Sequence, residues 1–228
     1  MRMGLAAPSC SRLLRRLALV AALAAAACGG DDGGSGDDGG DDGSDGSGGE
    51  ADAGGLPDAA PPFDATSTFL VLTSTAFEDG AAIPLRHACA DHGGDDLSPA
   101  LTWSGGPEAA GYAVVLTDRS IRGGFVHSVI WDIPGDVASL PEGVDKVAEP
   151  AEPAGAKQTL AYDNETRGYR GPCPPEEHSY EFALFALAEN PLPGVTLDST
   201  RDEVADALSE QAILSTLLVG TFTPPAKR

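Results

Sequence analysis

Between Gly29 and Gly55 the chain has almost nothing that a folded protein could bury. Of these 27 residues, 13 are Gly, nine are Asp or Glu and three are Ser. Such a stretch cannot offset the entropy of ordering its backbone, and its acidic side chains repel one another. We therefore expect a disordered, extended linker, which restricts the hydrophobic core to residues 65–228. A calcium site is the weaker interpretation, because the acidic run lacks the closing Glu and the flanking helices of an EF-hand.

The segment that precedes this linker predicts export. The first 28 residues carry four Arg and no acidic residue, and Leu17–Ala27 is an uninterrupted apolar run. Eleven apolar residues are too few to span a bilayer core of about 30 Å, but they suit the apolar region of a secretory signal peptide. We assign residues 1–27 to this signal.

The end of the apolar run, three Ala followed by Cys28, resembles a bacterial lipobox, although Ala25 stands where that pattern more often has Leu. The resemblance implies that Cys28 is acylated and becomes the N-terminus of an exported lipoprotein of the bacterial cell envelope. Residues 28–64 are then the acylated Cys and its linker, and the protein faces the periplasm or the exterior. The alternative is an ordinary cleavable signal peptide with an incidental Cys.

The charge of the chain excludes two classes of function. With 35 acidic residues against 14 Lys and Arg, the net charge is −21. Nucleic-acid binding requires clustered basic side chains, which this chain lacks, so we expect no nucleic-acid partner. No stretch after residue 28 offers the 18 apolar residues of a spanning helix, and an acidic surface does not attract anionic lipid. Membrane attachment therefore rests on the Cys28 lipid.

Two of the four cysteines remain for the folded part. Cys10 leaves with the signal peptide and Cys28 takes the lipid. Cys89 and Cys173 form an even pair in an oxidising compartment, which predicts a disulfide that closes a loop of 84 residues. Such a bond would add roughly 2–4 kcal/mol by restricting the unfolded chain. The alternative is two separate buried thiols.

The folded part is predicted to be mostly strand with one late helix. Runs that are alternating or rich in branched and aromatic residues occur at Phe69–Thr75, Ala100–Trp103, Tyr112–Thr117, Ser128–Ile133 and Tyr180–Ala188. A helix is predicted after Thr200, because Thr200 and Glu203 have the spacing of a capping box. Val204, Leu208 and the apolar residues beyond them continue that helical pattern.

Three ionisable residues stand at predicted strand ends. Asp118 closes one strand, His127 opens the next and His178 precedes the alternating strand at 180. Functional groups collect at such ends, where loops meet a rigid scaffold. A lone His is more often structural, but three such groups favour a shared site. An Asp/His/His metal triad is a less favoured alternative, and we expect neither a metal nor a cofactor.

Several longer motifs occur in a recognisable order. They are DLSPALTW (96–103), TD (117–118), HSVIWDIP (127–134), GYRGPCPPEEHSYEF (168–182) and LVGTFT (218–223). From about residue 69 to residue 223 the chain resembles the phosphatidylethanolamine-binding protein family, in particular its bacterial Raf-kinase-inhibitor-like members. The resemblance implies a mostly β, Greek-key antiparallel fold with a peripheral C-terminal helix. It also implies a small anion pocket at one end of that fold.

In this family the pocket takes a phosphate-like head group. The residues that the resemblance assigns to it here are Asp118, Phe125, His127, Cys173, Pro174, Pro175, His178 and Tyr180. Imidazole N–H groups, a Tyr hydroxyl and the backbone N–H groups of a Gly/Pro turn can all donate to phosphate oxygens. Asp118 would instead hold a His tautomer, or accept from an ammonium group or a phosphate hydroxyl.

The chain departs from the family pattern beside this pocket. The usual Asp-Pro-Asp-x-Pro is Asp118-Arg119-Ser120-Ile121-Arg122, and the usual His-Arg-Tyr is His178-Ser179-Tyr180. One hypothesis links the losses: Ser120 and Ser179 replace an Asp–Arg ion pair that supports the pocket. We also expect Arg119 and Arg122 to lean over its opening.

These features predict a membrane-tethered, non-enzymatic binding module for a phosphate-like head group, a phospholipid head group or another phosphorylated ligand. Inhibition of a partner protein is one form that such binding takes in relatives. The alternative is a hydrolase or lyase that uses His127 and His178 as acid and base.

Overall fold

The computed structural model describes residues 69–226. The predicted signal peptide, the acylated Cys28 and the linker lie outside the described residues. No helix within residues 69–226 is long and apolar enough to cross a membrane.

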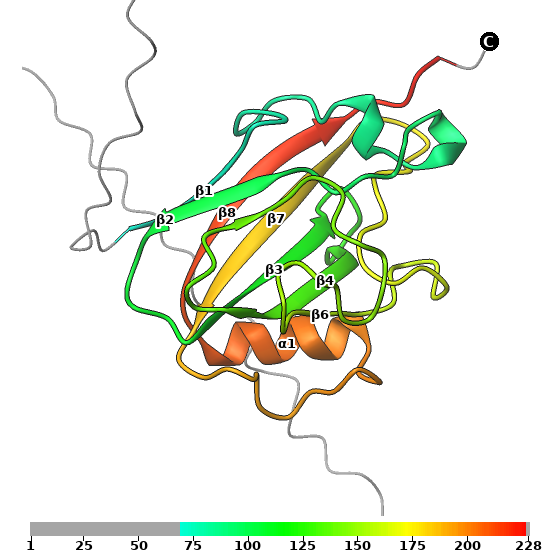
Figure 1. Cartoon of the computed structure of the whole chain (residues 1–228). Helices are drawn as coiled ribbons and strands as arrows, with labels where there is room; N and C mark the ends of the chain where they lie inside the picture. Colours follow the sequence, from blue (N-terminus) through cyan, green and yellow to red (C-terminus); the bar gives the residue numbers. More distant parts are fainter. Residues whose placement is uncertain (1–68, 227–228) are drawn as a thin grey trace, which may run out of the picture. The chain divides into compact units, whose positions relative to one another are not determined.

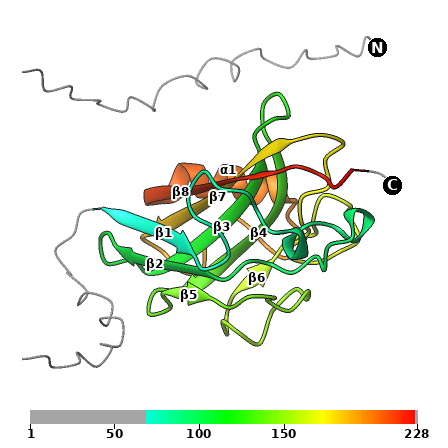
Figure 2. The same cartoon turned by 90° about the horizontal axis from the view of Figure 1, so that it is seen from above.

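The described residues form two antiparallel sheets and a helix, stacked in three layers (Figures 1 and 2). The smaller sheet has the order β1-β2-β5, formed by Leu70–Ser74, Leu101–Gly105 and Ser139–Leu140. The larger sheet has the order β6-β4-β3-β7-β8, formed by Lys157–Gln158, Phe125–Pro134, Gly111–Asp118, His178–Leu187 and Ala212–Phe222. Helix α1 (Arg201–Gln211) covers the other face of the larger sheet. The predicted mostly β fold with a peripheral helix is confirmed.

Side-chain alternation explains the layers. Along β7, Phe182 and Leu184 pack into the core between the two sheets, whereas Ala183 packs against the helix layer with Val204 and Leu208. The central strand β3 is buried along all eight residues, because it has a layer on each face and a paired strand on each side. Its sequence is accordingly apolar almost throughout.

The connections bring one end each of β3, β4, β7 and β8 to the same end of the larger sheet. Strands β3 and β4 form a hairpin, and the long connection after β4 carries β5 and β6 before β7 returns beside β3, as in a Greek key. In this register Asp118 pairs with both Phe125 and Tyr180, and His178 pairs with Phe222. Two short 3-10 turns, Leu85–His87 and Ala90–His92, lie at the same end of the molecule (Figure 1).

Helix α1 begins where the sequence predicts it. Thr200 accepts a hydrogen bond from the Glu203 backbone, and the Glu203 side chain accepts from the Thr200 backbone at 2.8 Å, which completes a capping box. The expected continuation of the helical pattern beyond Leu208 is wrong. The helix ends at Gln211, and the apolar residues that follow form β8, which pairs with β7 along its whole length.

Candidate functional site

A pocket opens at the end of the larger sheet where β3 ends and where β4 and β7 begin; the space inside it, open solvent included, is about 370 Å³. We call it the strand-end pocket. It is lined by all eight residues that the resemblance assigned, namely Asp118, Phe125, His127, Cys173, Pro174, Pro175, His178 and Tyr180, and also by Ile121 and Tyr162. Residues that are up to 62 positions apart in the sequence thus meet because the antiparallel register aligns their strand ends.

Asp118 and His178 form a close pair in this pocket. The Nδ1 atom of His178 lies 2.6 Å from Oδ2 of Asp118, and the two side chains are 14% and 3% exposed. An ionised carboxylate only accepts hydrogen bonds, so Nδ1 of His178 carries a proton and donates it. The second carboxylate oxygen accepts from the backbone N–H of Ser120 at 2.9 Å. Asp118 therefore fixes the orientation and tautomer of His178.

His127 has the opposite character. Its ring is packed against Tyr162, Tyr180 and Phe125, with centroid distances of 4.5, 5.3 and 5.6 Å. Burial is the main cause that lowers the pKa of His127 to about 4, and it outweighs the Arg170 carbonyl contact and the Asp118 charge, which both raise it. The ring is therefore neutral near pH 7.

Tyr180 supplies a hydroxyl with no partner of its own. The residue is fully buried, and its hydroxyl makes no hydrogen bond among the described residues. The Asp118 carboxylate and the Cys173 backbone both act on the pKa of this hydroxyl, the first raising it and the second lowering it. Burial, followed by the charge of Asp118, raises the pKa of Tyr180 far above its ordinary value, so the hydroxyl keeps its proton. A buried donor without an acceptor is costly, which makes this group a ready contact for a ligand.

Two arginines lie behind the aromatic walls. The Arg170 guanidinium lies 5.5 Å from the ring centre of Tyr162 and pairs with Asp163 at 3.1 Å. The Arg201 guanidinium lies 5.7 Å from the ring centre of Phe125 and donates to two backbone carbonyls. Their positive charges favour an anion in the pocket without lining it. Ile121 and Tyr162, which line the pocket, and the two arginines beside it were not predicted from the sequence.

One wall of the pocket belongs to residues 168–175, which we call the pocket loop. A disulfide joins Cys173 to Cys89, with 5.4 Å between their Cα atoms, as the sequence predicted. The backbone N–H of Cys89 donates to the Pro172 carbonyl at 3.0 Å, and the Nε2 atom of His92 lies 2.8 Å from the Pro174 carbonyl. The segment around Cys89 thus holds the pocket loop through one covalent bond and two hydrogen bonds.

The first residue of the DLSPALTW motif holds the same loop. One carboxylate oxygen of Asp96 accepts from the backbone N–H of Gly171 at 2.7 Å, and the other pairs with Lys146 at 2.6 Å. The Tyr169 hydroxyl donates to the His87 carbonyl at 2.7 Å. A side chain at Gly171 would collide with that carbonyl oxygen, so only Gly allows this close approach.

The residues that depart from the family pattern lie beside the pocket. The Ser120 hydroxyl accepts from the backbone N–H of Ser179 at 2.9 Å, so the two serines do contact each other. Arg119 pairs with Glu181 at 3.5 Å instead of leaning over the opening, and neither Arg119 nor Arg122 lines the pocket.

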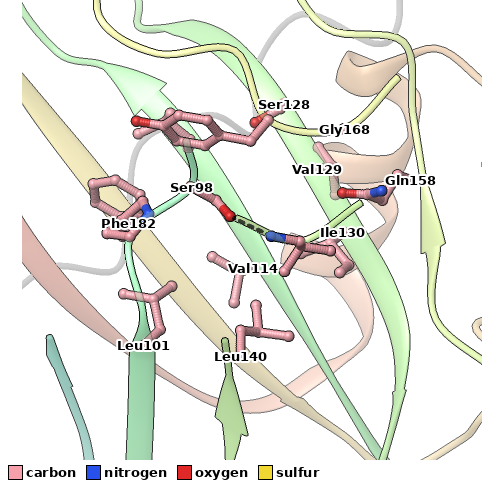
Figure 3. Close-up of a pocket in the computed structure, with 14 residues that line it drawn as sticks. Ser98, Leu101, Val114, Ser128, Val129, Ile130, Leu140, Gln158, Gly168 and Phe182 are labelled. Atoms are coloured by element: carbon pink, nitrogen blue, oxygen red, sulfur yellow. Dashed lines mark hydrogen bonds between the residues drawn. The ribbon is translucent and has the colours of Figure 1, made fainter. Parts of the chain in front are cut away.

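A second pocket lies inside the core between the two sheets (Figure 3). Its lining includes Leu101, Val114, Ile130, Leu140 and Phe182, all members of the core, and it contains no Asp, Glu, His, Lys or Arg. Its polar groups serve the fold: the Ser98 hydroxyl, for example, accepts from the backbone N–H of Val144 at 3.0 Å. The candidate chemistry therefore belongs to the strand-end pocket.

The described residues contain one group of three side chains with metal-ligand spacing, Cys89, His92 and Cys173. Its two sulfurs are bonded to each other, so they are not available as thiolate ligands. Asp118, His127 and His178 do not form such a group.

Comparisons with known proteins identify the family of the chain. The family model for the phosphatidylethanolamine-binding protein matches residues 73–223. LppC of Mycobacterium tuberculosis strain H37Rv, named as a lipoprotein, is 36% identical over 171 residues, which covers 72% of this chain and 77% of LppC. A UPF0098 protein of Methanothermobacter thermautotrophicus is 33% identical over 154 residues, which covers 66% of this chain and 97% of that protein.

A solved structure extends the likeness to three dimensions. The crystal structure of Escherichia coli YbcL, described as a new member of the mammalian PEBP family, superposes with a TM-score of 0.60 at 28% identity. The match covers 68% of this chain and 98% of YbcL. The matched span of the family model includes every residue that lines the strand-end pocket.

Proposed function

Because the chain belongs to the phosphatidylethanolamine-binding protein family, we propose that it is a membrane-tethered binding module whose strand-end pocket takes the phosphate group of a head group or of another phosphorylated ligand. One observation carries this proposal: the buried, unpartnered hydroxyl of Tyr180 lies in the same pocket as the Asp118–His178 pair. A hydroxyl and an imidazole N–H are groups that a phosphate oxygen accepts from.

The surroundings of the pocket support an anionic ligand. Arg170 and Arg201 place positive charge behind two of its aromatic walls. The walls themselves are apolar, with Phe125, Ile121 and two prolines beside the polar groups. A ligand that carries a phosphate on a small organic group would satisfy both kinds of contact.

The binding test is calorimetry with inorganic phosphate and phosphoethanolamine on the purified protein. Tyr180→Phe and His178→Gln should each weaken binding by about tenfold, the effect of one lost hydrogen bond to a charged group. Tyr112→Phe is the matched control, since it removes a hydroxyl from a buried Tyr of β3 that does not line the pocket. Absence of measurable binding by the unmodified protein would refute the proposed function.

The tether rests on Cys28 and on the lipoprotein name of the relative LppC. Cys28→Ser should move the protein from the membrane fraction to the soluble fraction of the cells that produce it. Cys10→Ser should not, because Cys10 lies within the predicted signal peptide. Membrane association that survives Cys28→Ser would refute the lipid anchor.

The hydrolase or lyase alternative has one observation in its favour, the Asp118–His178 pair, whose geometry suits acid–base work. The lining of the pocket, however, offers no Ser, Thr or free Cys as a nucleophile. Turnover of p-nitrophenyl phosphate that His178→Gln abolishes would favour the enzyme over the binding module.

A further inference from the structure

His127 presents a hydrogen-bond acceptor to the pocket. Its Nδ1 atom lies 3.3 Å from the carbonyl oxygen of Arg170, which can only accept, so Nδ1 holds the proton of the neutral ring. The other nitrogen, Nε2, has no hydrogen-bond partner among the described residues, and the residue is only 4% exposed. Since the ring lines the strand-end pocket, the lone pair of Nε2 is open to a ligand.

The groups around His127 keep it in this state. Asp118 is the one nearby charge that favours the imidazolium, while Arg201 and His178 both disfavour it. The remaining neighbours are the rings of Phe125, Tyr162 and Tyr180, which exclude water from the imidazole. The low pKa of His127, about 4, keeps the ring neutral near pH 7. The Arg170 carbonyl then decides which nitrogen carries the single proton.

The charges of the pocket leave no surplus cation in its lining. The carboxylate of Asp118 is hydrogen-bonded to the ring of His178, with 2.6 Å between Oδ2 and Nδ1. Arg170 and Arg201 do not line the pocket, and the Arg170 guanidinium pairs with Asp163. A doubly charged anion would therefore meet a buried carboxylate and an imidazole lone pair, and both would repel it.

We propose that the strand-end pocket selects a phosphate group that still carries a proton, and that the P–OH donates to Nε2 of His127 while Tyr180 donates to an ionised oxygen. This inference rests on the proposed function, because it names the ligand class of the same pocket. It assigns the role of hydrogen-bond acceptor to His127.

Four small anions can be distinguished by whether one of their oxygens carries a proton. Inorganic phosphate and methyl phosphate keep a proton on part of the population near neutral pH, since the second pKa of a phosphomonoester is about 6. Sulfate and dimethyl phosphate have the same tetrahedral oxygens and carry no such proton. A phosphomonoester can therefore supply the P–OH, whereas a phosphodiester, such as the phosphate of a lipid head group, cannot.

The experiment is calorimetric titration of the protein with each of the four probes at pH 6.5 and constant ionic strength. Inorganic phosphate and methyl phosphate should bind about tenfold or more tightly than sulfate and dimethyl phosphate, because the latter leave Nε2 of His127 buried without a donor. Sulfate or dimethyl phosphate that binds as tightly as phosphate would overturn the inference and leave the proposed function standing. Failure of all four probes to bind would refute the proposed function as well.

His127→Phe tests the residue directly, since it keeps an aromatic ring among its neighbours and removes the acceptor. The preference for the protonated probes should shrink to about twofold. His178→Gln should weaken the binding of all four probes and leave the preference, and Tyr112→Phe should change neither. A preference that survives in a folded His127→Phe protein would overturn the inference.

A second measurement needs no variant. Nitrogen NMR of the unmodified protein, labelled at histidine, reports which ring nitrogens carry protons. In the phosphate complex His127 should show a protonated Nδ1 and an unprotonated Nε2. Protons on both nitrogens would show that the ring donates to the ligand, and the inference would fail.

Discussion

The side-chain hydroxyl of Ser120 accepts a hydrogen bond from the backbone N–H of Ser179 at 2.9 Å. This bond ties the loop after β3 to the start of β7, next to the pair formed by Asp118 and His178. The family resembled by the sequence has Asp and Arg at the two serine positions. A hydrogen bond thus links the two segments where the family pattern has opposite charges.

Restoring both charges should restore an ion pair. Ser120→Asp and Ser179→Arg each introduce one charge that has no designed partner, whereas the double variant contains both partners. We expect the free energy of unfolding of the double variant to exceed the value obtained by adding the two single effects by about 0.5–1 kcal/mol, the range of a solvent-exposed ion pair. Urea unfolding of the four proteins measures this coupling. Strictly additive effects would contradict the replacement hypothesis, and Ser120→Asn with Ser179→Gln provides an uncharged control.

The disulfide between Cys89 and Cys173 should stabilise both the fold and the pocket. It closes a loop across 84 residues, so its loss should lower the free energy of unfolding by about 2–4 kcal/mol. Because Cys173 lines the pocket, reduction should also weaken phosphate binding. Thermal unfolding and calorimetry with and without reductant measure the two effects, and a variant with Ser at both positions should not respond to reductant. Two titratable thiols in the native, unreduced protein would show that the bond is absent in solution.

Burial of neutral His127 should make stability depend on pH. The pKa is lowered from 6.5 to about 4 in the folded protein, so between these values the unfolded chain binds more protons. The contribution of His127 to the free energy of unfolding is therefore fully present above about pH 6.5. It is lost as the pH falls toward 4, by an amount on the order of 3 kcal/mol. His127→Phe should show a smaller decrease in the free energy of unfolding between pH 7 and pH 4.5. Identical pH profiles for the two proteins would contradict the low pKa.

Gly171→Ala should disrupt the pocket loop. The added methyl group would overlap the carbonyl oxygen of His87, so the loop must move away from its hydrogen bond to Asp96. We expect a loss of about 1–3 kcal/mol, typical of overpacking, together with weaker phosphate binding. Gly80→Ala is a control in which the new methyl group meets no atom within 4 Å, although its φ of +78° still carries the strain of a left-handed residue. Equal effects of the two substitutions on phosphate binding would contradict this account of the loop.

The sequence was informative wherever local pattern and structure coincide. The pattern along residues 180–188 predicted a strand, and Phe182 and Leu184 do face a different layer from Ala183, as alternation in a strand requires. The spacing of Thr200 and Glu203 located the start of α1. The pocket residues were identified because they lie within motifs that keep their order along the chain.

Other features depend on contacts that a single sequence does not display. Ile213, Leu214 and Leu217 fit either a helical continuation or a strand, and pairing with β7 decides for the strand. Tyr162 reaches the pocket because its backbone N–H donates to the His127 carbonyl at 2.9 Å. Arg201 comes from the start of α1 and bonds to a carbonyl 75 residues earlier in the chain. The neutral state of His127 follows from its burial, which its position at a strand end did not indicate.

The complete burial of β3 has a consequence for how the site opens. Strand β3 is paired on both sides and covered on both faces, so its amide hydrogens should exchange with solvent only when the whole domain unfolds. The pocket loop is held by a few hydrogen bonds and one disulfide. Its amide hydrogens should therefore exchange through local opening of the loop, without unfolding of the domain. If the proposed phosphate binds in the strand-end pocket, which Cys173, Pro174 and Pro175 of the loop line, it should slow the second process and leave the first unchanged. Opening of the pocket loop would then not require β3 to unfold, and Asp118, at the end of that strand, would keep its place.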